Sequence, residues 1–600
     1  MTPIRQNHYL LILALALTAC CLCTAASAAN QLAGHPSPYL ALHADDPVHW
    51  KSWQAEAFSE AQASNRLVLV SVGYFSCHWC HVMQQQSYQD AETAEFLNRN
   101  FISVKVDREL EPDLDQRLIT FVEQVRGVAG WPLNVFITPD GYPLTGFTYL
   151  PRDEFLRLLQ HLDQEWKQNE VALSASAREF FELGTQRADG QVENQTISSA
   201  TLVDAFVADA MRNADDLQGG FGDTSKFPNV PQLNALIDSL ELAPSAASEI
   251  TEFVQLSLDM MASRNLKDHI NNGFFRYTTD PDWHTPHFEK MLYDNALLAA
   301  LYLKAHRIWP RRDYATTALQ TLDFVELQLK HPQGGYMSSL SAVDSDNREG
   351  GAYLWSHEQL AGLLDATELA QLQQNWVQAS VADGLLLRPA STANNAGQSI
   401  VNRSIRLKLQ AGGTRSMPVD DKRLASWNAM MLNALTLATD VDARFAGRAQ
   451  ALYRTMRELF MVDGTLIRFA GNAEIAAAVF EDYAHTAIAF LRYGQRFNDA
   501  QAIKLARHLN ERAHAVFLQN GRWQAKAQPL IPIAPGKWVI EDLVFYSPMT
   551  LWLEATLAAP ELDEKVRSSA TGMMQRVTRE MLDRPYYHGS FIMLRANSQR

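Results

Sequence analysis

The stretch LVLVSVGYFSCHWC, residues 67–80, decides the fold of the first part of the chain. Residues 67–72 are apolar and rich in valine, which is typical of a buried strand, and residues 73–76 form a short turn before Cys77. We therefore expect Cys77 in the first turn of a helix and Cys80 one turn later. The free backbone amides and the positive end of the helix dipole stabilise a thiolate there, and so lower the pKa of the thiol.

Apolar runs beyond this stretch predict an α/β domain. We expect further strands at residues 101–106, 133–138 and 144–149, the last two joined by a Pro-Asp-Gly turn. Residues 153–166 have the apolar spacing of a closing helix. The resulting order is β-α-β-α-β-β-α, in a domain that spans residues 30–175.

The two cysteines predict thiol–disulfide exchange. Cys77 is the expected nucleophile, and Cys80 is the resolving cysteine because it can attack a mixed disulfide from within the helix. His78, and His81 after it, would add positive charge or hydrogen bonds near the sulfur atoms. This charge would shift the redox potential in the oxidising direction.

Trp131 and Pro132 stand directly before the third predicted strand. A cis Pro132 at this point would bring backbone groups opposite the dithiol and expose Cys77 to an extended substrate chain. The candidate catalytic residues are therefore Cys77, Cys80, Pro132 and His78.

Two other interpretations of the dithiol remain. Half of a zinc site is disfavoured, because the chain has no second cysteine pair and the neighbouring histidines are unsuitably spaced. The pair could also oxidise without turning over a substrate. We expect neither a metal site nor a cofactor.

The other three of the five cysteines, Cys20, Cys21 and Cys23, lie in the first apolar run, and none follows Cys80. This distribution excludes a network of structural disulfides in the body of the protein.

The first 28 residues resemble an export signal. Arg5 precedes the apolar run 10–23, which is too short to span a bilayer and is followed by small residues. Cleavage after Ala28 would release a periplasmic or secreted protein without a transmembrane segment. Residues 17–20 also resemble a bacterial lipoprotein box, in which case Cys20 would carry a lipid anchor.

The composition is that of an ordinary globular protein. Of the 600 residues, 47% are hydrophobic and 20% are charged, which excludes a disordered or collagen-like chain. Acidic residues outnumber lysine and arginine by 67 to 52, so the formal net charge is −15. This charge would repel a phosphate backbone or an anionic membrane surface, and nucleic acid is not an expected partner.

The rest of the chain predicts a linker and a helical domain. Residues 176–200 are polar and poor in large apolar groups, and we expect a linker there. Residues 201–600 contain long stretches with helical spacing, such as 296–308 and 315–329, separated by glycine–aromatic turns. These turns recur at about one helical hairpin apart, which favours an α/α toroid of about six hairpins.

Several long motifs occur in order along nearly the whole mature chain. In the first half these are Ser37-Pro38-Tyr39-Leu40 with His43, Pro47-Val48 and Trp50; Cys77-His78-Trp79-Cys80-His81-Val82-Met83; Val106-Asp107-Arg108-Glu109; and Gly130-Trp131-Pro132-Leu133. In the second half they are Gly219-Gly220-Phe221-Gly222 with Lys226-Phe227-Pro228; Asp268-His269-Ile270; the run from Pro286 to Asn295; Asp421-Lys422 with Ser426-Trp427-Asn428; and Glu481-Asp482-Tyr483. With these motifs the chain resembles the spermatogenesis-associated protein 20-like family. The resemblance implies a thioredoxin-like domain joined to a six-hairpin α/α toroid, and it leaves the activity open.

The densest group of ionisable and aromatic residues follows Thr285. Thr285 and the proline after it predict a helix start that places His287, Lys290, Met291 and Asp294 on one helix face. A toroid mouth lined in this way resembles that of the N-acylglucosamine 2-epimerase and glycoside hydrolase relatives. Buried polar networks that tie helix ends together would use the same residue types.

The candidate substrate-binding residues come from both halves of the chain. They are Trp79, Trp131, Asp268, His269, Arg276, Trp283, His287, Glu289, Asp294, Trp427 and Asp482.

Three hypotheses follow for function. The leading one is an exported thiol–disulfide oxidoreductase that acts on protein thiols or disulfides, in which Cys77 attacks, Cys80 resolves and the toroid recruits partners. The alternative is a toroid that binds or modifies a carbohydrate, centred on His287, Glu289 and Asp294. The third is a scaffold without catalytic activity.

Overall fold

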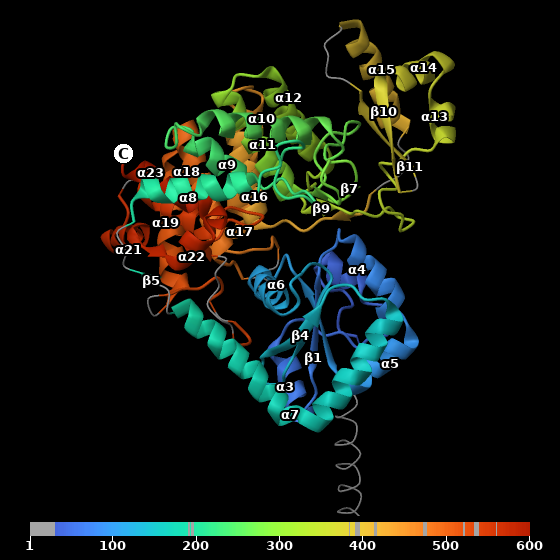
Figure 1. Ribbon diagram of the computed structural model, residues 1–600, viewed down its shortest axis with the longest axis vertical. Helices are drawn as coiled ribbons and strands as arrows, with labels where there is room; N and C mark the ends of the chain where they lie inside the picture. The colour runs from blue at the N-terminus through green and yellow to red at the C-terminus, as the bar shows by residue number, and fades with distance from the viewer. Residues whose placement is uncertain are drawn as a thin grey trace, which may run out of the picture.

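A computed structural model of the chain places a small α/β domain against a larger helical domain (Figure 1). It describes residues 30–189, 192–193, 197–382, 384–390, 396–412, 417–471, 477–519, 522–527, 529–532, 539–559 and 561–600. The expected export signal lies outside these residues. Within them, no helix combines the length and the apolar character needed to cross a membrane.

The α/β domain contains the predicted four-stranded sheet. The strands are β1 (Val68–Gly73), β2 (Ile102–Asp107), β3 (Leu133–Ile137) and β4 (Pro143–Phe147), in the order β2-β1-β3-β4. β2 is parallel to β1, and β3 is antiparallel to both β1 and β4. This topology confirms the thioredoxin-like fold.

Helices cover both faces of this sheet. On one face, apolar residues of α3 (Ala55–Ser64) and α6 (Pro112–Arg126) pack against alternate residues of β1, β2 and β3. The other face is covered by α4 (His78–Met83), α5 (Ala91–Asn100) and α7 (Arg152–Asp189) (Figure 1). A short first helix, α2 (Pro38–Leu42), packs beside β2, and a π-helical turn (Gln84–Tyr88) follows α4. The sheet therefore holds the turn after β1 at one end of the domain.

The segment expected as a linker is largely helical. α7 continues from Arg152 to Asp189, with non-helical backbone angles at Asn169. The closing helix is thus longer than the predicted 153–166. The expectation of a linker was based on the polarity of this segment. The segment is also rich in alanine, glutamate and arginine, which have high helix propensity, so a polar helix forms there.

The helical domain is a closed ring of six hairpins in the part of the chain that the structure describes. The inner helices are α9 (Val230–Ser239), α11 (Leu292–Ile308), α16 (Ala425–Ala438), α18 (Phe480–Phe497), α20 (Pro548–Ala558) and α23 (Gly589–Ser598), each packed against the next, and α23 packs against α9. Their outer partners are α10 (Ala247–Ser263), α12 (Arg312–Gln328), α17 (Phe445–Phe460), α19 (Ala500–Phe517), α21 (Glu564–Gln575) and, beside α23, α8 (Ser199–Arg212). The first and last of these helices form the sixth hairpin, which confirms the expected α/α toroid.

The inner and outer helices differ in sequence as their positions require. α16 and α20 are apolar on almost all sides, because they contact other helices around most of their circumference. α17 and α19 bury one stripe of apolar residues and expose the opposite face of the helix. The turns also follow expectation: Gly273 has φ +73°, and a side chain there would overlap the ring of Phe324.

Two groups of smaller elements lie outside the twelve ring helices. One is an excursion beside the ring, with α13 (His357–Leu363), α14 (Ala366–Asn375), β10 (Trp376–Val381), β11 (Gly384–Pro389) and α15 (Ala396–Gly412) (Figure 1). The other comprises short elements between helices: the two-residue hairpins β13 (Met461–Val462) with β14 (Thr465–Leu466) and β15 (Leu518–Gln519) with β16 (Arg522–Trp523), the pair β5 (Val192–Glu193) with β17 (Val577–Thr578), α22 (Arg579–Asp583) and a 3-10 turn (Pro585–His588). The excursion was not expected from the sequence.

The predicted helix start at Thr285 is wrong. Pro286–His287 forms β7, which pairs with β6 (Tyr277–Thr278), and Lys290–Met291 forms β8. β8 joins β9 (Ser339–Leu340) and β12 (Val419–Asp420) in a three-stranded sheet, and α11 begins only at Leu292. Pairing with neighbouring loops satisfies the backbone groups of this segment, so the capping signal at Thr285 is overridden by tertiary contacts.

Candidate active site at the domain interface

Cys77 and Cys80 form a disulfide at the start of α4. β1 ends at Gly73, the chain turns, and Cys77 becomes the residue that caps the helix. The Cys77 sulfur accepts a hydrogen bond from the Cys80 amide at 3.2 Å. Cys77 thus sits at the positive end of the helix, as the sequence predicts.

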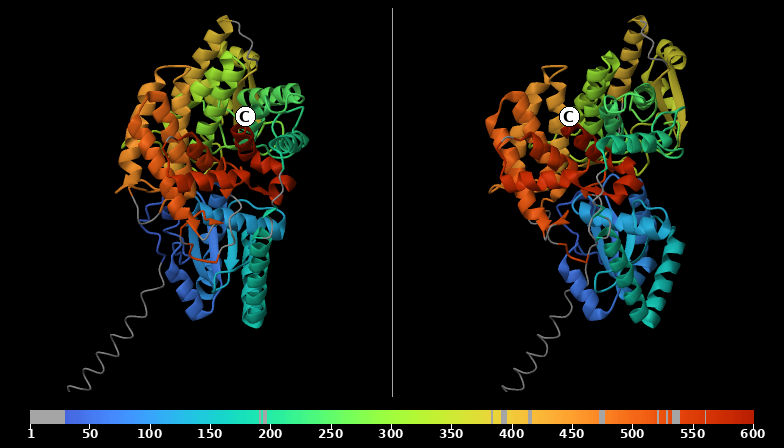
Figure 2. Two further views of the ribbon diagram at one scale, coloured as in Figure 1. Left: turned by 90° about the vertical axis from the view of Figure 1, so that its left-hand side faces the viewer. Right: turned by 60° about the vertical axis from the view of Figure 1, so that its left-hand side comes forward.

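The toroid covers this disulfide. Cys77 is 3% exposed and Cys80 is 1% exposed. The amide of Ala342 donates a hydrogen bond to the Ser76 carbonyl at 3.1 Å, and the Ser76 hydroxyl lies 3.3 Å from the Met291 sulfur. Figure 2 shows the thioredoxin-like domain lying against the helical domain in both turned views. The dithiol therefore lies in an interface and not on an open surface.

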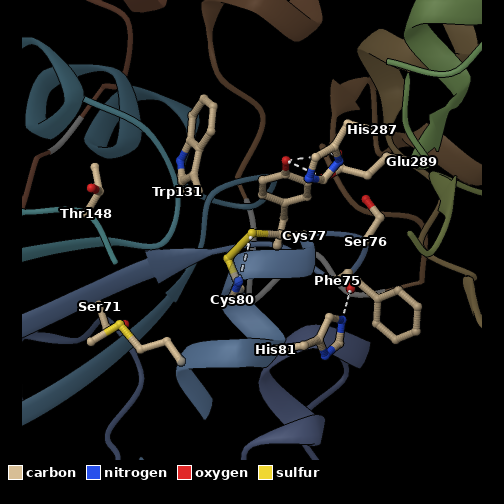
Figure 3. Close-up of a disulfide and its surroundings, with 12 residues drawn as sticks. Ser71, Phe75, Ser76, Cys77, Cys80, His81, Trp131, Thr148, His287 and Glu289 are labelled. Atoms are coloured by element: carbon tan, nitrogen blue, oxygen red, sulfur yellow. Dashed lines mark hydrogen bonds and ion pairs between the residues drawn. A yellow bond between two sulfur atoms is a disulfide. The ribbon is translucent and has the colours of Figure 1, made fainter. Parts of the chain in front are cut away.

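Charged groups of the toroid meet the thioredoxin-like domain beside the disulfide (Figure 3). The Tyr74 hydroxyl donates to Glu289 at 2.9 Å, and the Arg276 guanidinium contacts both Tyr74 and, at 3.1 Å, Glu289. Burial would raise the pKa of Glu289, but the positive charges of His287 and Arg276 lower it to about 2. Glu289 is consequently an anion that three side chains hold in place.

His287 is the histidine of the site whose charged form is favoured by its neighbours. Its Nδ1 atom lies 3.1 Å from Glu289, and although burial opposes the charge, Glu289 and Glu349 raise the pKa of His287. Burial instead lowers the pKa of both His78 and His81. Burial therefore disfavours the positive charge that His78 and His81 were expected to add.

His78 faces the toroid. Its Nε2 atom lies 3.6 Å from Glu349, and its ring centroid is 6.3 Å from that of His287. His81 instead turns back to its own domain, with Nε2 2.8 Å from the Phe75 carbonyl. His78 is thus part of the interface, whereas His81 supports the turn before Cys77.

The aromatic residues near the dithiol have different environments. Trp131 donates from Nε1 to Asp115 at 2.7 Å and lies under the Arg108 guanidinium, and the peptide bond between Trp131 and Pro132 is cis. Trp79 is 45% exposed and packs against Tyr149. The Arg276 guanidinium of the toroid lies 5.3 Å from the centre of the Trp131 ring, so Trp131 belongs to the interface, whereas Trp79 faces solvent.

A second buried site lies at the mouth of the ring, under the start of α6. It is a cavity of about 70 Å³ lined by residues of both domains. They include Arg108, Glu109, Asp115, Trp427, Arg468, Glu481, Glu541, Phe545 and Tyr546. Trp427 is 2% exposed, and its indole N–H has no hydrogen-bond partner.

Four of the remaining predicted site residues have structural partners, and the fifth, Asp294, has a buried carboxylate oxygen without a hydrogen-bond partner. Asp268 binds Lys290 at 2.6 Å, the His269 ring bonds the Arg264 carbonyl, and Trp283 donates to the Gln218 carbonyl. Asp482 binds Arg468 at 2.8 Å and caps α18 through the Val479 amide at 3.0 Å. Asp294 lies buried near Arg276, and burial raises the pKa of Asp294 to about 8. The predicted set thus separates into an interface group, one residue in the cavity, buried residues within the toroid, and the exposed Trp79.

Sequence reasoning missed Tyr74 and Lys422. Lys422 lies within a motif of the family resemblance, but Tyr74 occurs in a turn without any pattern that marks it. The described residues include no group of three or more histidine, cysteine or acidic side chains arranged to hold a metal ion.

Comparisons with known proteins agree with this architecture. The family model Thioredox_DsbH, described as a protein of unknown function, DUF255, matches residues 29–183. Spermatogenesis-associated protein 20 from Rattus norvegicus is 32% identical over 464 residues, which cover 69% of this chain and 58% of the relative. The Homo sapiens protein of the same name is 32% identical over 453 residues, covering 67% of this chain and 58% of the relative.

The resemblance to the spermatogenesis-associated protein 20-like family is confirmed. The chain spans less than two thirds of the length of these curated relatives.

Solved structures similar to the toroid include carbohydrate enzymes. Cellobiose 2-epimerase from Spirochaeta thermophila is 14% identical with a TM-score of 0.44, covering 67% of this chain and 94% of that protein. The GH76A α-1,6-mannanase of Salegentibacter sp. is 9% identical with a TM-score of 0.38, covering 67% of this chain and all of that protein.

Proposed function

We propose that the protein is an exported thiol–disulfide oxidoreductase that uses Cys77 and Cys80. The disulfide at the positive end of α4, beside the buried pair of His287 and Glu289, is the observation that carries this proposal. An incoming thiolate attacks the Cys77 sulfur, the bond to Cys80 breaks, and its electron pair stays on Cys80. In the reverse step the Cys80 thiolate attacks Cys77 in the mixed disulfide and releases the partner thiol.

The cover over the disulfide restricts the substrate. Because Cys77 is 3% exposed, a folded protein cannot reach it while the domains are in contact. A small thiol or a short extended cysteine peptide is the substrate class that fits. The toroid thus acts as a filter between the dithiol and larger partners.

Export supports the same chemistry. The apolar segment 10–23 and the small residues after it favour an oxidising compartment, where a dithiol can cycle by disulfide exchange.

Equilibration with glutathione tests this function. The chain without residues 1–28 is incubated in mixtures of reduced and oxidised glutathione, and its free thiols are trapped with an alkylating agent. We expect one reversible two-electron transition between roughly −120 and −270 mV, the range from dedicated oxidants to reductases. A disulfide that never forms, or that resists reduction at every ratio, would remove the proposal.

The cavity at the mouth of the ring supports a second candidate function, carbohydrate binding. Trp427 supplies an aromatic face and an N–H without an acceptor, which a sugar hydroxyl could satisfy. Glu109, whose carboxyl group also lacks a hydrogen-bond partner, lies on the same wall, although its Oε2 atom is 3.2 Å from Lys422. This site differs from the alternative centred on His287, Glu289 and Asp294, none of which lines the cavity.

Calorimetric titration tests the second function. The protein is titrated separately with glucose, mannose, N-acetylglucosamine and cellobiose. We expect saturable binding of at least one sugar and a loss of about tenfold or more in Trp427→Ala, since buried aromatic anchors dominate such sites. The matched control is Trp79→Ala, which removes an exposed tryptophan outside the cavity and should bind as the parent does. Absence of saturation with all four sugars would contradict this function.

A further inference from the structure

The leaving group of the proposed exchange is deeply buried. When a thiolate attacks Cys77, the electron pair of the broken bond passes to the Cys80 sulfur, yet Cys80 is 1% exposed. Burial without a hydrogen bond disfavours a thiolate and raises the pKa of its thiol. Rapid exchange therefore requires a donor close to the Cys80 sulfur.

The Tyr39 hydroxyl lies beside this sulfur. A side chain at Gly73 would place its first carbon 2.8 Å from the Cys80 sulfur and would overlap the Tyr39 hydroxyl. Both groups thus occupy the space left by the missing side chain of Gly73. Tyr39 comes from α2, which precedes the first strand of the thioredoxin-like domain.

The Tyr39 hydroxyl is buried and unpaired in the disulfide form. Tyr39 is 1% exposed, and its oxygen has no hydrogen-bond partner. An unused buried hydroxyl is costly, so its retention points to a partner present in another state of the protein. The reduced dithiol is such a state, because opening the disulfide frees a sulfur that can accept a hydrogen bond.

The surroundings keep Tyr39 in its neutral, donating form. Burial, together with the charges and partial charges of Tyr88, Asp107 and Asp46, raises the pKa of Tyr39 well above 10. Lys105, whose ammonium nitrogen lies 5.4 Å from the Tyr39 ring, faces the same cluster and bonds the Ser71 hydroxyl at 3.0 Å. Tyr39 therefore keeps its proton and is able to donate a hydrogen bond.

The loop before Tyr39 fixes its position. The Ser37 hydroxyl donates to Asp107 at 2.6 Å and accepts from the Leu40 amide at 3.2 Å. These bonds tie α2 to the end of β2, so that the tyrosine ring has little freedom to turn away.

We propose that the Tyr39 hydroxyl donates a hydrogen bond to the Cys80 thiolate as the disulfide opens, and so makes Cys80 a better leaving group. This inference rests on the proposed exchange at Cys77. The bond between the incoming sulfur and Cys77 forms, the bond between Cys77 and Cys80 breaks, and the electron pair that reaches Cys80 is stabilised by the Tyr39 O–H. The sequence motif that contains Tyr39 thereby gains a chemical role.

The test compares Tyr39→Phe with the parent in the chain without residues 1–28. Dithiothreitol is the attacking thiol. Samples are quenched at timed intervals with an alkylating agent, and the fraction of alkylated protein gives the rate of disulfide opening. We expect a decrease of about tenfold, the effect of one lost hydrogen bond to a charged group. In a Cys77→Ser background, the same change should raise the pKa of Cys80 by about one, measured from the ultraviolet absorbance of the Cys80 thiolate against pH.

Tyr88→Phe is the matched control. Tyr88 lies in the same aromatic cluster, but its hydroxyl bonds Ser71 and Asn134 and not a sulfur. We expect the rate of opening in this variant to stay within twofold of the parent. The melting temperature of oxidised Tyr39→Phe should be no lower than that of the parent, because the hydroxyl that is removed has no partner in that form and its burial is costly.

The outcomes separate this inference from the proposed function. If the parent opens its disulfide and Tyr39→Phe opens at the same rate, the role of Tyr39 is wrong while the exchange chemistry stands. If the parent itself does not react with dithiothreitol in its folded state, the proposed exchange at Cys77 is wrong.

Discussion

Cys77→Ser should reduce the rate of thiol–disulfide exchange by about a thousandfold or more, to the background of the uncatalysed reaction. Serine cannot form the disulfide, and Cys80 is buried inside α4, where an external disulfide cannot reach it. The measurement is the rate of reduction of a short disulfide-bonded peptide by glutathione, with and without the protein. A variant that retained the parent rate would show that the activity lies elsewhere.

Cys80→Ser provides the matched comparison. This variant keeps the nucleophile but lacks the resolving thiol, so a mixed disulfide between Cys77 and the peptide should accumulate instead of turning over. Mass spectrometry of the acid-quenched reaction detects this adduct. Accumulation in Cys80→Ser but not in Cys77→Ser would assign the attacking and resolving roles.

Lys422→Met should destabilise the protein by about 3–5 kcal/mol. Lys422 is fully buried, and its ammonium group lies 2.6 Å from Asp420, 2.7 Å from Asp107 and 3.2 Å from Glu109. It therefore joins carboxylates of both domains. Without the cation, these carboxyl groups would remain together in the interface without a compensating charge, which is much more costly than the loss of a surface ion pair.

Urea unfolding measures this effect. The control is Lys408→Met, which breaks a pair with Glu368 near the surface and should cost less than about 1 kcal/mol. The difference in the free energy of unfolding between Lys422→Met and the parent should decrease as the pH falls, because protonation removes the repulsion among the carboxylates. Its disulfide should also react faster with dithiothreitol, since weaker contact between the domains exposes Cys77. If the free energy of unfolding of Lys422→Met at neutral pH were within about 1 kcal/mol of that of the parent, Lys422 would not stabilise the interface as we expect.

The elements of both domains follow from local sequence patterns. The four strands lie within one or two residues of the predicted ranges, and Cys77 caps α4 as expected, because valine-rich runs and capping positions act over a few residues. The helical spacing and glycine turns likewise predict the toroid. The helix start at Thr285 is wrong, because tertiary pairing overrides a capping signal there, and the segment expected as a linker is largely helical.

The sequence by itself thus determined the thioredoxin-like fold, the toroid and the position of the dithiol. Only the tertiary structure decided what surrounds the dithiol: Tyr74 meets Glu289 across 215 residues of chain, and Asp107 meets Lys422 across 315. Periodicity and propensity describe neighbours along the chain, whereas these contacts depend on how two separately folded domains pack. Packing buried the disulfide, placed His287 beside it and brought Tyr39 next to Cys80.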